Sequence, residues 1–234
     1  VGAKNAWAYD LSAAGSGFVY ALVTASQCIH SGAHRRVMVI GADKMSSILD
    51  MKDRNTCVLF GDGAGGVILD RSEDSSMGLL DFLHCADGSN TDSLNVLGGG
   101  SLNPASHVSV DQGLHFVRQD GRSVFKFAVS KMAEVSSELL NRNGLTGQDL
   151  RLFIPHQANL RIIDSAAERL KLPPEKVLVN IDRYANTTAA TIPIALSQAC
   201  EEERLKAGDL LLMTGVGAGL TWGSALYCWG GDRD

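Results

Sequence analysis

Two stretches of the chain repeat the same order of sequence patterns, one over residues 6–70 and the other over residues 177–229. Each stretch reads as a short strand ending in Asp, a run of small residues, a helix, an apolar strand, a glycine-rich turn and a last strand. A repeat of this kind predicts a fold built from two similar halves. The alternation of helices and strands within each half predicts stacked α/β layers.

The hydrophobic periodicity predicts the individual elements. The run at 36–43 is almost continuously apolar, which is typical of a strand buried on both faces. Residues 87–113 are rich in Gly, Ser, Asn and Asp, and predict a long functional or mobile loop. We expect strands at Ala6–Asp10, Arg36–Asp43, Val67–Asp70, Leu152–Pro155, Val177–Ile181, Asp209–Thr214 and Gly223–Trp229, helices at about Phe18–His30, Ser123–Asn143, Leu160–Leu170 and Thr188–Arg204, and glycine turns at 61–66 and 215–219.

The two copies of the repeat are unequal in length. The second has an extra helix, strand and helix before the shared unit, whereas the first begins almost at that unit. We therefore expect the chain to be truncated at its N-terminus, and the opening strands and helices of the first half to be missing. The expected boundaries give residues 1–78 as the C-terminal part of the first half and residues 79–234 as the second half.

The composition excludes several classes of protein. Of the 234 residues, 45% are hydrophobic and 20% are charged, and the net charge is −5. Such a chain can bury a core, and its mild acidity argues against a nucleic-acid binder. The sequence contains no apolar run of the ~18 residues that a membrane helix needs, and no leader peptide. The five cysteines form no CxxC pair, which predicts buried structural thiols in a reducing compartment and no metal site.

One candidate for chemistry is His156, in the segment PHQANLR. It follows an apolar strand and precedes a helix. Reactive groups in α/β folds often lie at such strand ends. Taken alone, His156 could equally be a core histidine, because its neutral ring needs only one donor and one acceptor partner.

A second candidate is Asn186, in the segment YANTTAATIP at a helix entrance. Asn is among the best N-cap residues, so capping alone would explain it. The two glycine turns are also weak signals by themselves, because glycine is common in tight turns. The combination of these features is more specific than any one of them.

The motifs occur in a defined order along the chain: AYDLSAAGSGF (8–18), FGDGAG (60–65), PHQANLRI (155–162), ANTTAATIP (185–193) and GAGLTWGSAL (217–226). With this set the chain resembles the β-ketoacyl-acyl carrier protein synthase III family, within the thiolase-like condensing enzymes. The resemblance covers essentially the whole chain and leaves out the first third of the family's length. It implies a thiolase-like α/β fold, layered α-β-α-β-α and made of two duplicated halves, of which the first is incomplete here.

The resemblance implies a decarboxylating Claisen condensation that initiates fatty-acid synthesis. A cysteine thiolate at a helix N-terminus takes an acyl group from acyl-CoA, malonyl-acyl carrier protein loses CO2, and the enolate attacks the acyl thioester to give a 3-oxoacyl-acyl carrier protein. By similarity, His156 and Asn186 donate hydrogen bonds to the malonyl thioester carbonyl and stabilise the enolate. The backbone N–H groups of Ala218 and of residue 15 would form the oxyanion hole.

The resemblance also implies substrate contacts and partners. Arg161 matches a contact for the carrier protein and pantetheine, and Arg54 matches a residue near the CoA adenine. The expected partners are acyl carrier protein, acyl-CoA and a second copy in a homodimer, in the cytoplasm, with no cofactor, nucleic acid or membrane. Further substrate contacts are expected at Gly121, Phe125, Ala158 and Leu220, and minor carrier contacts at Lys126 and Arg169, for which solvated surface is an equally good interpretation.

One position departs from the family pattern. The nucleophilic Cys of the family lies five residues after the Asp of the first motif, and Gly15 stands at that position here. Glycine has no side chain, so no acyl-enzyme can form there. An engineered replacement, a natural loss of condensation and a misassigned residue would each explain the glycine. Alternative functions are a non-catalytic subunit of a heteromeric ketosynthase, or a ketosynthase or acyltransferase of secondary metabolism.

Overall fold

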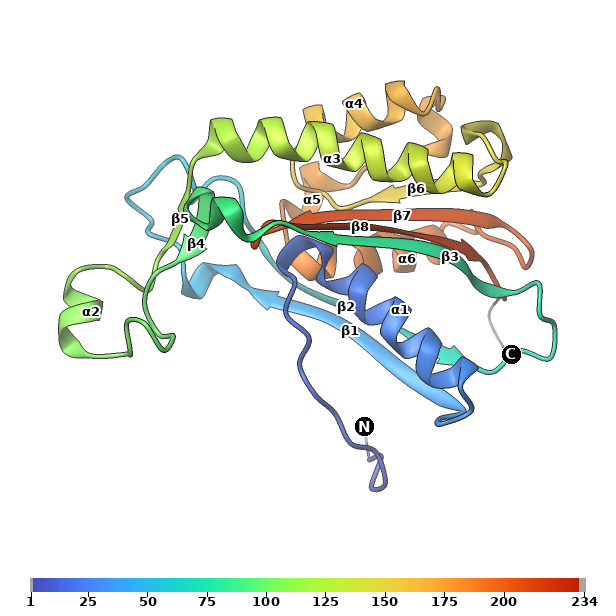
Figure 1. The fold of residues 1–234 in the computed structure, drawn as a ribbon, viewed down its shortest axis with the longest axis horizontal. Helices are drawn as coiled ribbons and strands as arrows, with labels where there is room; N and C mark the ends of the chain where they lie inside the picture. Colours follow the sequence, from blue (N-terminus) through green and yellow to red (C-terminus); the bar gives the residue numbers. More distant parts are fainter. Residues whose placement is uncertain (1, 232–234) are drawn as a thin grey trace.

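The computed structural model describes residues 2–231, which form alternating layers of helices and strands (Figure 1). Helices α3 (Gly121–Arg142) and α4 (Leu160–Arg169) form the first layer. Below them lies a sheet with the strand order β3-β8-β7-β6. Helices α1 (Gly17–His30) and α6 (Thr191–Glu201) lie beneath that sheet, and the pair β1–β2 follows them.

The larger sheet lies at the centre of the molecule, between two layers of helices. Its strands are β3 (Gly78–Ala86), β6 (Leu152–Pro155), β7 (Leu210–Gly217) and β8 (Thr221–Cys228). β8 runs antiparallel to both β3 and β7, whereas β6 runs parallel to β7. Separate hydrophobic clusters lie on its two faces, one against α3 and α4 and one against α1 and α6. The sheet is therefore buried on both sides, as the apolar sequence of β7 predicts.

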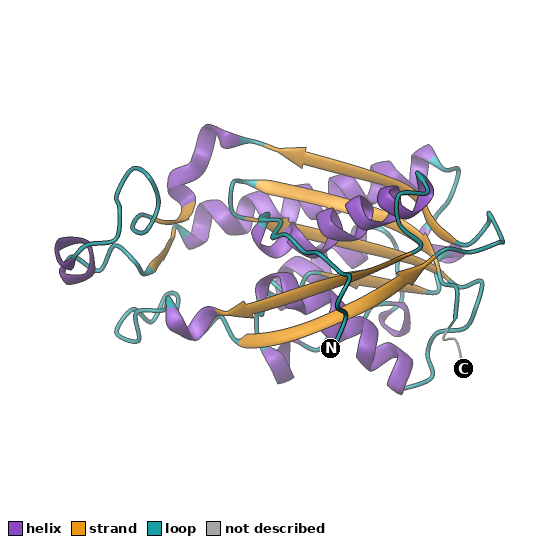
Figure 2. Ribbon diagram, turned by 90° about the horizontal axis from the view of Figure 1, so that it is seen from below, coloured by secondary structure: helices purple, strands orange, loops and turns teal. Residues whose placement is uncertain are grey.

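The second sheet consists of β1 (Arg36–Lys44) and β2 (Asp62–Asp70), which pair antiparallel from Arg36–Asp70 to Lys44–Asp62. Its burial alternates along β1, where Val39 and Gly41 are buried but Met38 and Ile40 are exposed. The expectation that 36–43 is buried on both faces is therefore wrong. Within the described residues no helix covers the outer face of this pair, which lies nearest the viewer in Figure 2.

The two copies of the repeat begin their central helices in the same way. A 3₁₀ turn, Ala14–Ser16, leads into α1, and a second one, Thr188–Ala190, leads into α6. The first residue of each turn is left-handed, with φ of 46° at Ala14 and 48° at Thr188. Non-glycine residues adopt this conformation at a cost, and such strain concentrates at functional sites.

Most of the glycine-rich stretches lie in strands rather than in turns. Residues 62–66 belong to β2, and 215–217 belong to β7, so the turns expected at 61–66 and 215–219 are largely wrong. The glycines instead permit close packing. A Cβ on Gly65 would lie 2.9 Å from the Ile194 amide of α6, and a Cβ on Gly215 would lie 2.8 Å from the carbonyl oxygen of Gly15.

Two expected strands are absent, and one observed strand is not among those expected. Residues 6–10 form no strand and are exposed, because no neighbouring strand pairs with them among the described residues. Residues 177–181 make only a bridge from Val177 to Phe153 before α5 (Ile181–Tyr184) begins. Strand β3 was not expected, because GLLDFLHCA shows no clear alternation. Its strand structure comes from pairing with β8.

The expected loop at 87–113 contains short elements and projects from the body at the left of Figure 1. It carries β4 (Leu94–Val96) and α2 (His107–Asp111), and β4 pairs with β5 (Val117–Gln119) just before α3. Asp120 caps α3 by accepting hydrogen bonds from the amides of Arg122 and Ser123. This projecting segment therefore delivers the first turn of α3 to the cavity described below.

Two other expectations concern cysteines and membranes. All five cysteines are free thiols, but only Cys228 is buried and the others are half-buried, so the expectation of buried thiols holds for one of them. Among residues 2–231, no helix is long and apolar enough to cross a membrane. The same residues contain no group of His, Cys, Asp and Glu that could hold a metal ion.

Candidate active site

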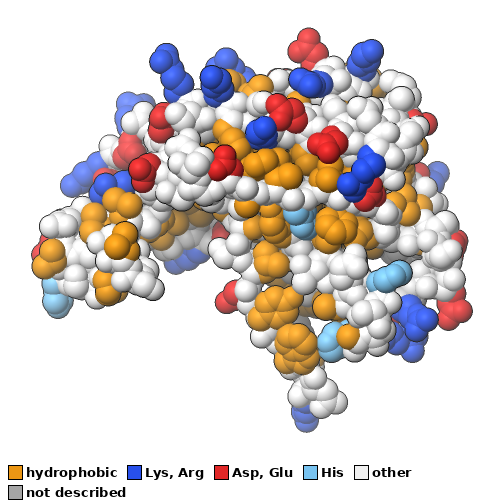
Figure 3. All heavy atoms as spheres, in the orientation of Figure 1, with side chains coloured by type: hydrophobic (Ala, Val, Ile, Leu, Met, Phe, Trp, Pro, Cys, Tyr) orange, Lys and Arg blue, Asp and Glu red, His pale blue; other side chains and the backbone are white. Residues whose placement is uncertain are grey.

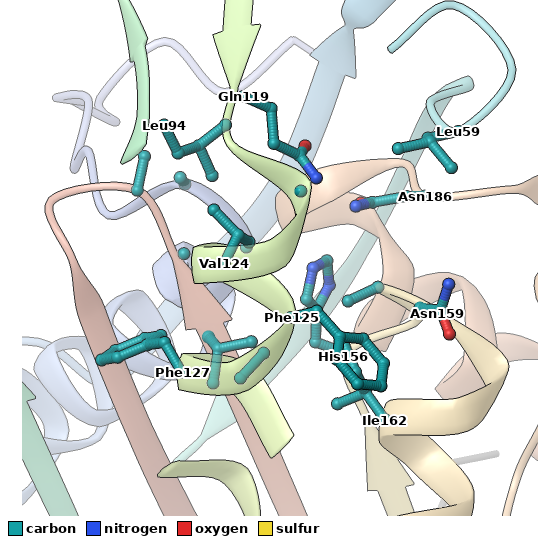
Figure 4. Close-up of a pocket in the computed structure, with 18 of the residues that line it drawn as sticks. Leu59, Leu94, Gln119, Val124, Phe125, Phe127, His156, Asn159, Ile162 and Asn186 are labelled. Atoms are coloured by element: carbon teal, nitrogen blue, oxygen red, sulfur yellow. The ribbon is translucent and has the colours of Figure 1, made fainter. Parts of the chain in front are cut away.

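A cavity of about 440 Å³ opens where the large sheet meets the 3₁₀ turn before α1 and the first turns of α3. Its walls come from segments far apart in the sequence, including Gly15, His156, Asn186 and Ala218. Figure 4 shows Asn186 and His156 reaching the cavity from different segments, with Phe125 of α3 close by. The four residues expected to do chemistry therefore lie on one cavity, although their roles remain predictions.

His156 follows directly after β6 and is only 3% exposed. Its backbone N–H donates to the Thr214 carbonyl oxygen at 2.7 Å, which ties it to β7. Burial lowers the pKa of His156 from 6.5 to about 4. The ring is therefore neutral at physiological pH, and one of its two nitrogens carries no proton.

Asn186 is held from both sides. Its backbone N–H donates to the Leu59 carbonyl and its carbonyl accepts from the Gly61 N–H, each at 3.0 Å, so residues 59–61 fix its position. Its side-chain Oδ1 accepts a hydrogen bond from the Thr188 N–H at 2.9 Å. Because that bond fixes the oxygen, the Nδ2 group is left to donate to a ligand.

Gly15 is the second residue of the turn before α1, so its N–H is one of the amides without a partner inside the helix. At the matching position of the second repeat, the Ala189 N–H donates to Asp43 Oδ2 at 2.9 Å. Gly217 lies next to Gly15, and a Cβ added at residue 217 would lie 2.7 Å from the Gly15 nitrogen. A side chain at residue 217 would collide with this amide, so the close approach of the two segments requires glycine.

The space around position 15 has no room for a side chain larger than that of glycine. A Cβ at this position would lie 2.5 Å from His156 Nε2 and would also contact the Val216 carbonyl oxygen at less than van der Waals distance. His156 Nε2 thus faces the point where a nucleophilic side chain would begin. Any larger residue at position 15 requires movement of His156 and of the end of β7.

The predicted substrate contacts divide into two groups. Gly121, Phe125, Ala158 and Leu220 line the cavity. Arg161 lies at its edge, with the guanidinium 4.9 Å from the centre of the Phe125 ring. Three other predicted residues are exposed and do not line the cavity: Arg54, Lys126 and Arg169.

Comparison with known sequences identifies the chain's relatives. Residues 9–88 match the profile of 3-oxoacyl-[acyl-carrier-protein] synthase III, and residues 140–229 match the profile of the C-terminal part of that enzyme. The chain is 55% identical to the β-ketoacyl-[acyl-carrier-protein] synthase III of Chlorobium luteolum over 230 residues, which are 98% of this chain and 70% of the relative. The chain belongs to the β-ketoacyl-acyl carrier protein synthase III family.

Solved structures of the synthase III family have the same fold. The enzyme of Aquifex aeolicus aligns with a TM-score of 0.86 and 47% identity, over 97% of this chain and 68% of that one. A priming β-ketosynthase of a polyketide pathway aligns with a TM-score of 0.87 and 33% identity, over 99% of this chain and 68% of that one. The thiolase-like α/β fold expected from the motifs is confirmed.

The motifs of this synthase III homologue do not indicate all the residues that form or support the cavity. Thr188 lines it, and Thr191 hydrogen-bonds the His156 ring. Both lie inside the quoted segment ANTTAATIP, so the motif contained the signal without indicating which side chains face His156. Gln119 and Asn159 also line the cavity. Asn159 lies in the quoted segment PHQANLRI, where it caps α4, whereas Gln119 lies outside every quoted motif at the end of β5.

Proposed function

We propose that this protein works on the substrates of its family, a malonyl thioester of acyl carrier protein and an acyl-CoA, and needs no further cofactor. The complete reaction would be the decarboxylating Claisen condensation that gives a 3-oxoacyl-acyl carrier protein and begins fatty-acid synthesis. With Gly15 at the nucleophile position, the chain as its sequence stands performs only the decarboxylating half. The convergence of His156 and Asn186 on a cavity that lacks a nucleophile supports this proposal.

The decarboxylation step needs no nucleophile. The bond between the carboxylate carbon and the α-carbon of the malonyl group breaks, CO2 leaves, and the electron pair moves into the thioester enolate. Water then protonates the α-carbon to give an acetyl thioester. Asn186 lines the cavity, and its Nδ2 group is available to donate to such an enolate oxygen.

Malonyl-acyl carrier protein provides the direct test. We expect acetyl-acyl carrier protein and CO2 to form faster than in buffer, with no acyl group on the enzyme by intact mass. Loss of one donor from such a site slows the reaction by roughly 10²–10³-fold, which is the effect expected for Asn186→Ala. Decarboxylation no faster than in buffer would exclude this activity.

A second experiment restores the nucleophile. Gly15→Cys in the intact protein is expected to take up one acyl group from acyl-CoA, because the thiol would stand at the N-terminus of α1 beside His156. The gain is read as a mass increase that hydroxylamine reverses. Gly15→Ser is the matched control and should stay unlabelled. An unlabelled Gly15→Cys protein that is folded would contradict the assignment of position 15.

The remaining features of the proposal concern partners. In this proposal Arg161 at the cavity edge meets the pantetheine arm, Arg54 meets the CoA adenine, and the exposed Lys126 and Arg169 offer positive charge to an acidic carrier protein. We further propose a cytoplasmic homodimer, as the resemblance implies. A non-catalytic subunit of a heteromeric ketosynthase is the second candidate, and the glycine at position 15 favours it. Copurification with an active ketosynthase and no decarboxylation would distinguish the two.

A further inference from the structure

Thr191 contacts the His156 ring from the first residue of α6. It is 2% exposed, and its Oγ1 lies 2.7 Å from His156 Nδ1. The same Oγ1 lies 3.1 Å from the carbonyl oxygen of Thr188 and is aligned to donate to it. The hydroxyl therefore joins the imidazole to the strained turn at Thr188, on the side of the ring away from Gly15.

A hydroxyl has one proton, so two arrangements compete. In the first, the Thr191 hydroxyl donates to an unprotonated Nδ1, and Nε2 carries the ring proton. In the second, Nδ1–H donates to Thr191 Oγ1, and the hydroxyl donates onward to the Thr188 carbonyl. The second arrangement makes one more hydrogen bond than the first.

Burial makes this difference important. Thr191 and the ring are almost inaccessible to water, so a hydroxyl lone pair without a partner cannot be satisfied by solvent. The Thr188 carbonyl also accepts the Thr191 backbone N–H, so the turn holds this acceptor beside the hydroxyl. A carbonyl can only accept, so a hydroxyl that donates to it has no proton left for Nδ1 and can only accept from the ring.

We propose that Thr191 is a positioning residue that holds the ring proton of His156 on Nδ1 and leaves Nε2 unprotonated toward residue 15. His156 Nε2 is then a hydrogen-bond acceptor in the resting site. It faces a group at position 15, since a Cβ there would lie 2.5 Å away. This role goes beyond the proposed function, because the resemblance assigns nothing to Thr191.

The same arrangement changes what His156 can do for a thioester carbonyl. A neutral ring protonated on Nδ1 cannot donate from Nε2, so Asn186 Nδ2 is the side-chain donor of the resting site. Donation by His156 needs a second proton on the ring, and the pKa of about 4 makes that form scarce at neutral pH. Asn186→Ala is therefore expected to slow decarboxylation more than His156→Ala does.

Nitrogen NMR of the ring tests the proposal without any turnover. In the intact protein labelled with ¹⁵N-histidine at pH 7, His156 should show a pyrrole-type Nδ1 and a pyridine-type Nε2. The signals are assigned by their loss in His156→Gln. A protonated Nε2 in the unsubstituted protein would overturn the proposal. Because no substrate is present, this result is independent of whether the protein decarboxylates malonyl thioesters.

Two substitutions separate positioning from packing. Thr191→Ser keeps the hydroxyl and should keep the pyrrole-type Nδ1. Thr191→Val keeps the shape and removes the hydroxyl, so the Nδ1 resonance should move toward the pyridine type while the backbone spectrum stays folded. An unchanged Nδ1 resonance in folded Thr191→Val would show that Thr191 does not set the proton. If Thr191→Val does not fold, a protonated Nε2 in the unsubstituted protein or in Thr191→Ser would still overturn the proposal.

Discussion

At the residue scale, the burial of His156 links the site to the stability of the fold. Its pKa is lowered from 6.5 to about 4 by desolvation. The unfolded chain therefore binds a proton between these pH values and the native protein does not. The contribution of neutral His156 to the free energy of unfolding is fully present above pH 6.5. It is lost as the pH decreases toward 4, by about 3 kcal/mol in all for a shift of this size.

Urea unfolding of the protein and of His156→Gln between pH 7 and pH 4.5 measures this effect, within the window set by the two pKa values. The difference in unfolding free energy between the two proteins should shrink as the pH falls, because glutamine does not titrate. Aspartates with lowered pKa, such as Asp81, contribute equally to both proteins. Parallel pH profiles would show that His156 is not held neutral by the fold.

Gly15 gives a second residue-scale prediction. Gly15→Ala adds only a methyl group, but that group meets His156 Nε2 at 2.5 Å and the Val216 carbonyl. Overpacking of this kind costs about 1–3 kcal/mol, which denaturant unfolding would detect. Gly88→Ala is the control, because nothing lies within 4 Å of its Cβ. Equal stability of the two variants would mean that the site already has room for a side chain.

At the element scale, β2 and α6 depend on glycine for their contact. A Cβ on Gly65 would lie 2.9 Å from the Ile194 nitrogen and 3.0 Å from the Pro193 carbonyl carbon, both backbone atoms. Gly65→Ala must push α6 away from β2, and we expect a loss of about 1–3 kcal/mol in unfolding free energy. Gly100→Ala, on open surface, should change it by less than about 0.5 kcal/mol. A Gly65→Ala protein as stable as Gly100→Ala would contradict this packing.

The sequence predicted best those elements whose pattern reflects local burial. Leu152–Pro155 was expected as a strand with the bounds that β6 has, and the helix expected from Phe18 begins one residue earlier. Strand β3 was missed because its strand structure comes from β8. The strand expected at 6–10 is absent because no described neighbour pairs with it. Partners distant in the sequence decide such cases, and local propensity does not.

The sequence motifs predicted which segments form the candidate site, but not how their side chains contact one another. The quoted segments contain Gly15, His156, Asn186 and Ala218, which share one cavity. The order of motifs says nothing about hydrogen-bond direction, so it could not show that Thr191 faces His156 Nδ1. It also could not show that Gly217 packs against the Gly15 amide. These contacts depend on how α6 and β7 approach the site, which only the assembled fold determines.

At the scale of the whole molecule, the large sheet is covered on both faces whereas β1–β2 is covered on one. Hydrophobic side chains also gather on the projecting segment that carries α2 (Figure 3), where Leu102 is 90% exposed. On the outer face of β1–β2, Met38, Ile40 and Ile68 are 48%, 62% and 59% exposed. Apolar side chains grouped on one face of a sheet are typical of surfaces that contact something else.

The exposure of this face can be measured directly. The triple variant Met38→Thr, Ile40→Thr and Ile68→Thr should bind an apolar fluorescent dye less than the unsubstituted protein does. Its unfolding free energy should change by less than about 1 kcal/mol, because the three side chains already contact water.

Val39→Thr is the matched control for the triple variant, since Val39 lies on the inner face of the same strand and is 4% exposed. Burying its hydroxyl should cost about 1–3 kcal/mol. If the triple variant loses as much stability as Val39→Thr, the outer face is packed in solution as the inner face is. Unchanged dye binding with unchanged stability would place the apolar surface elsewhere, with the projecting segment at α2 as the next surface to substitute.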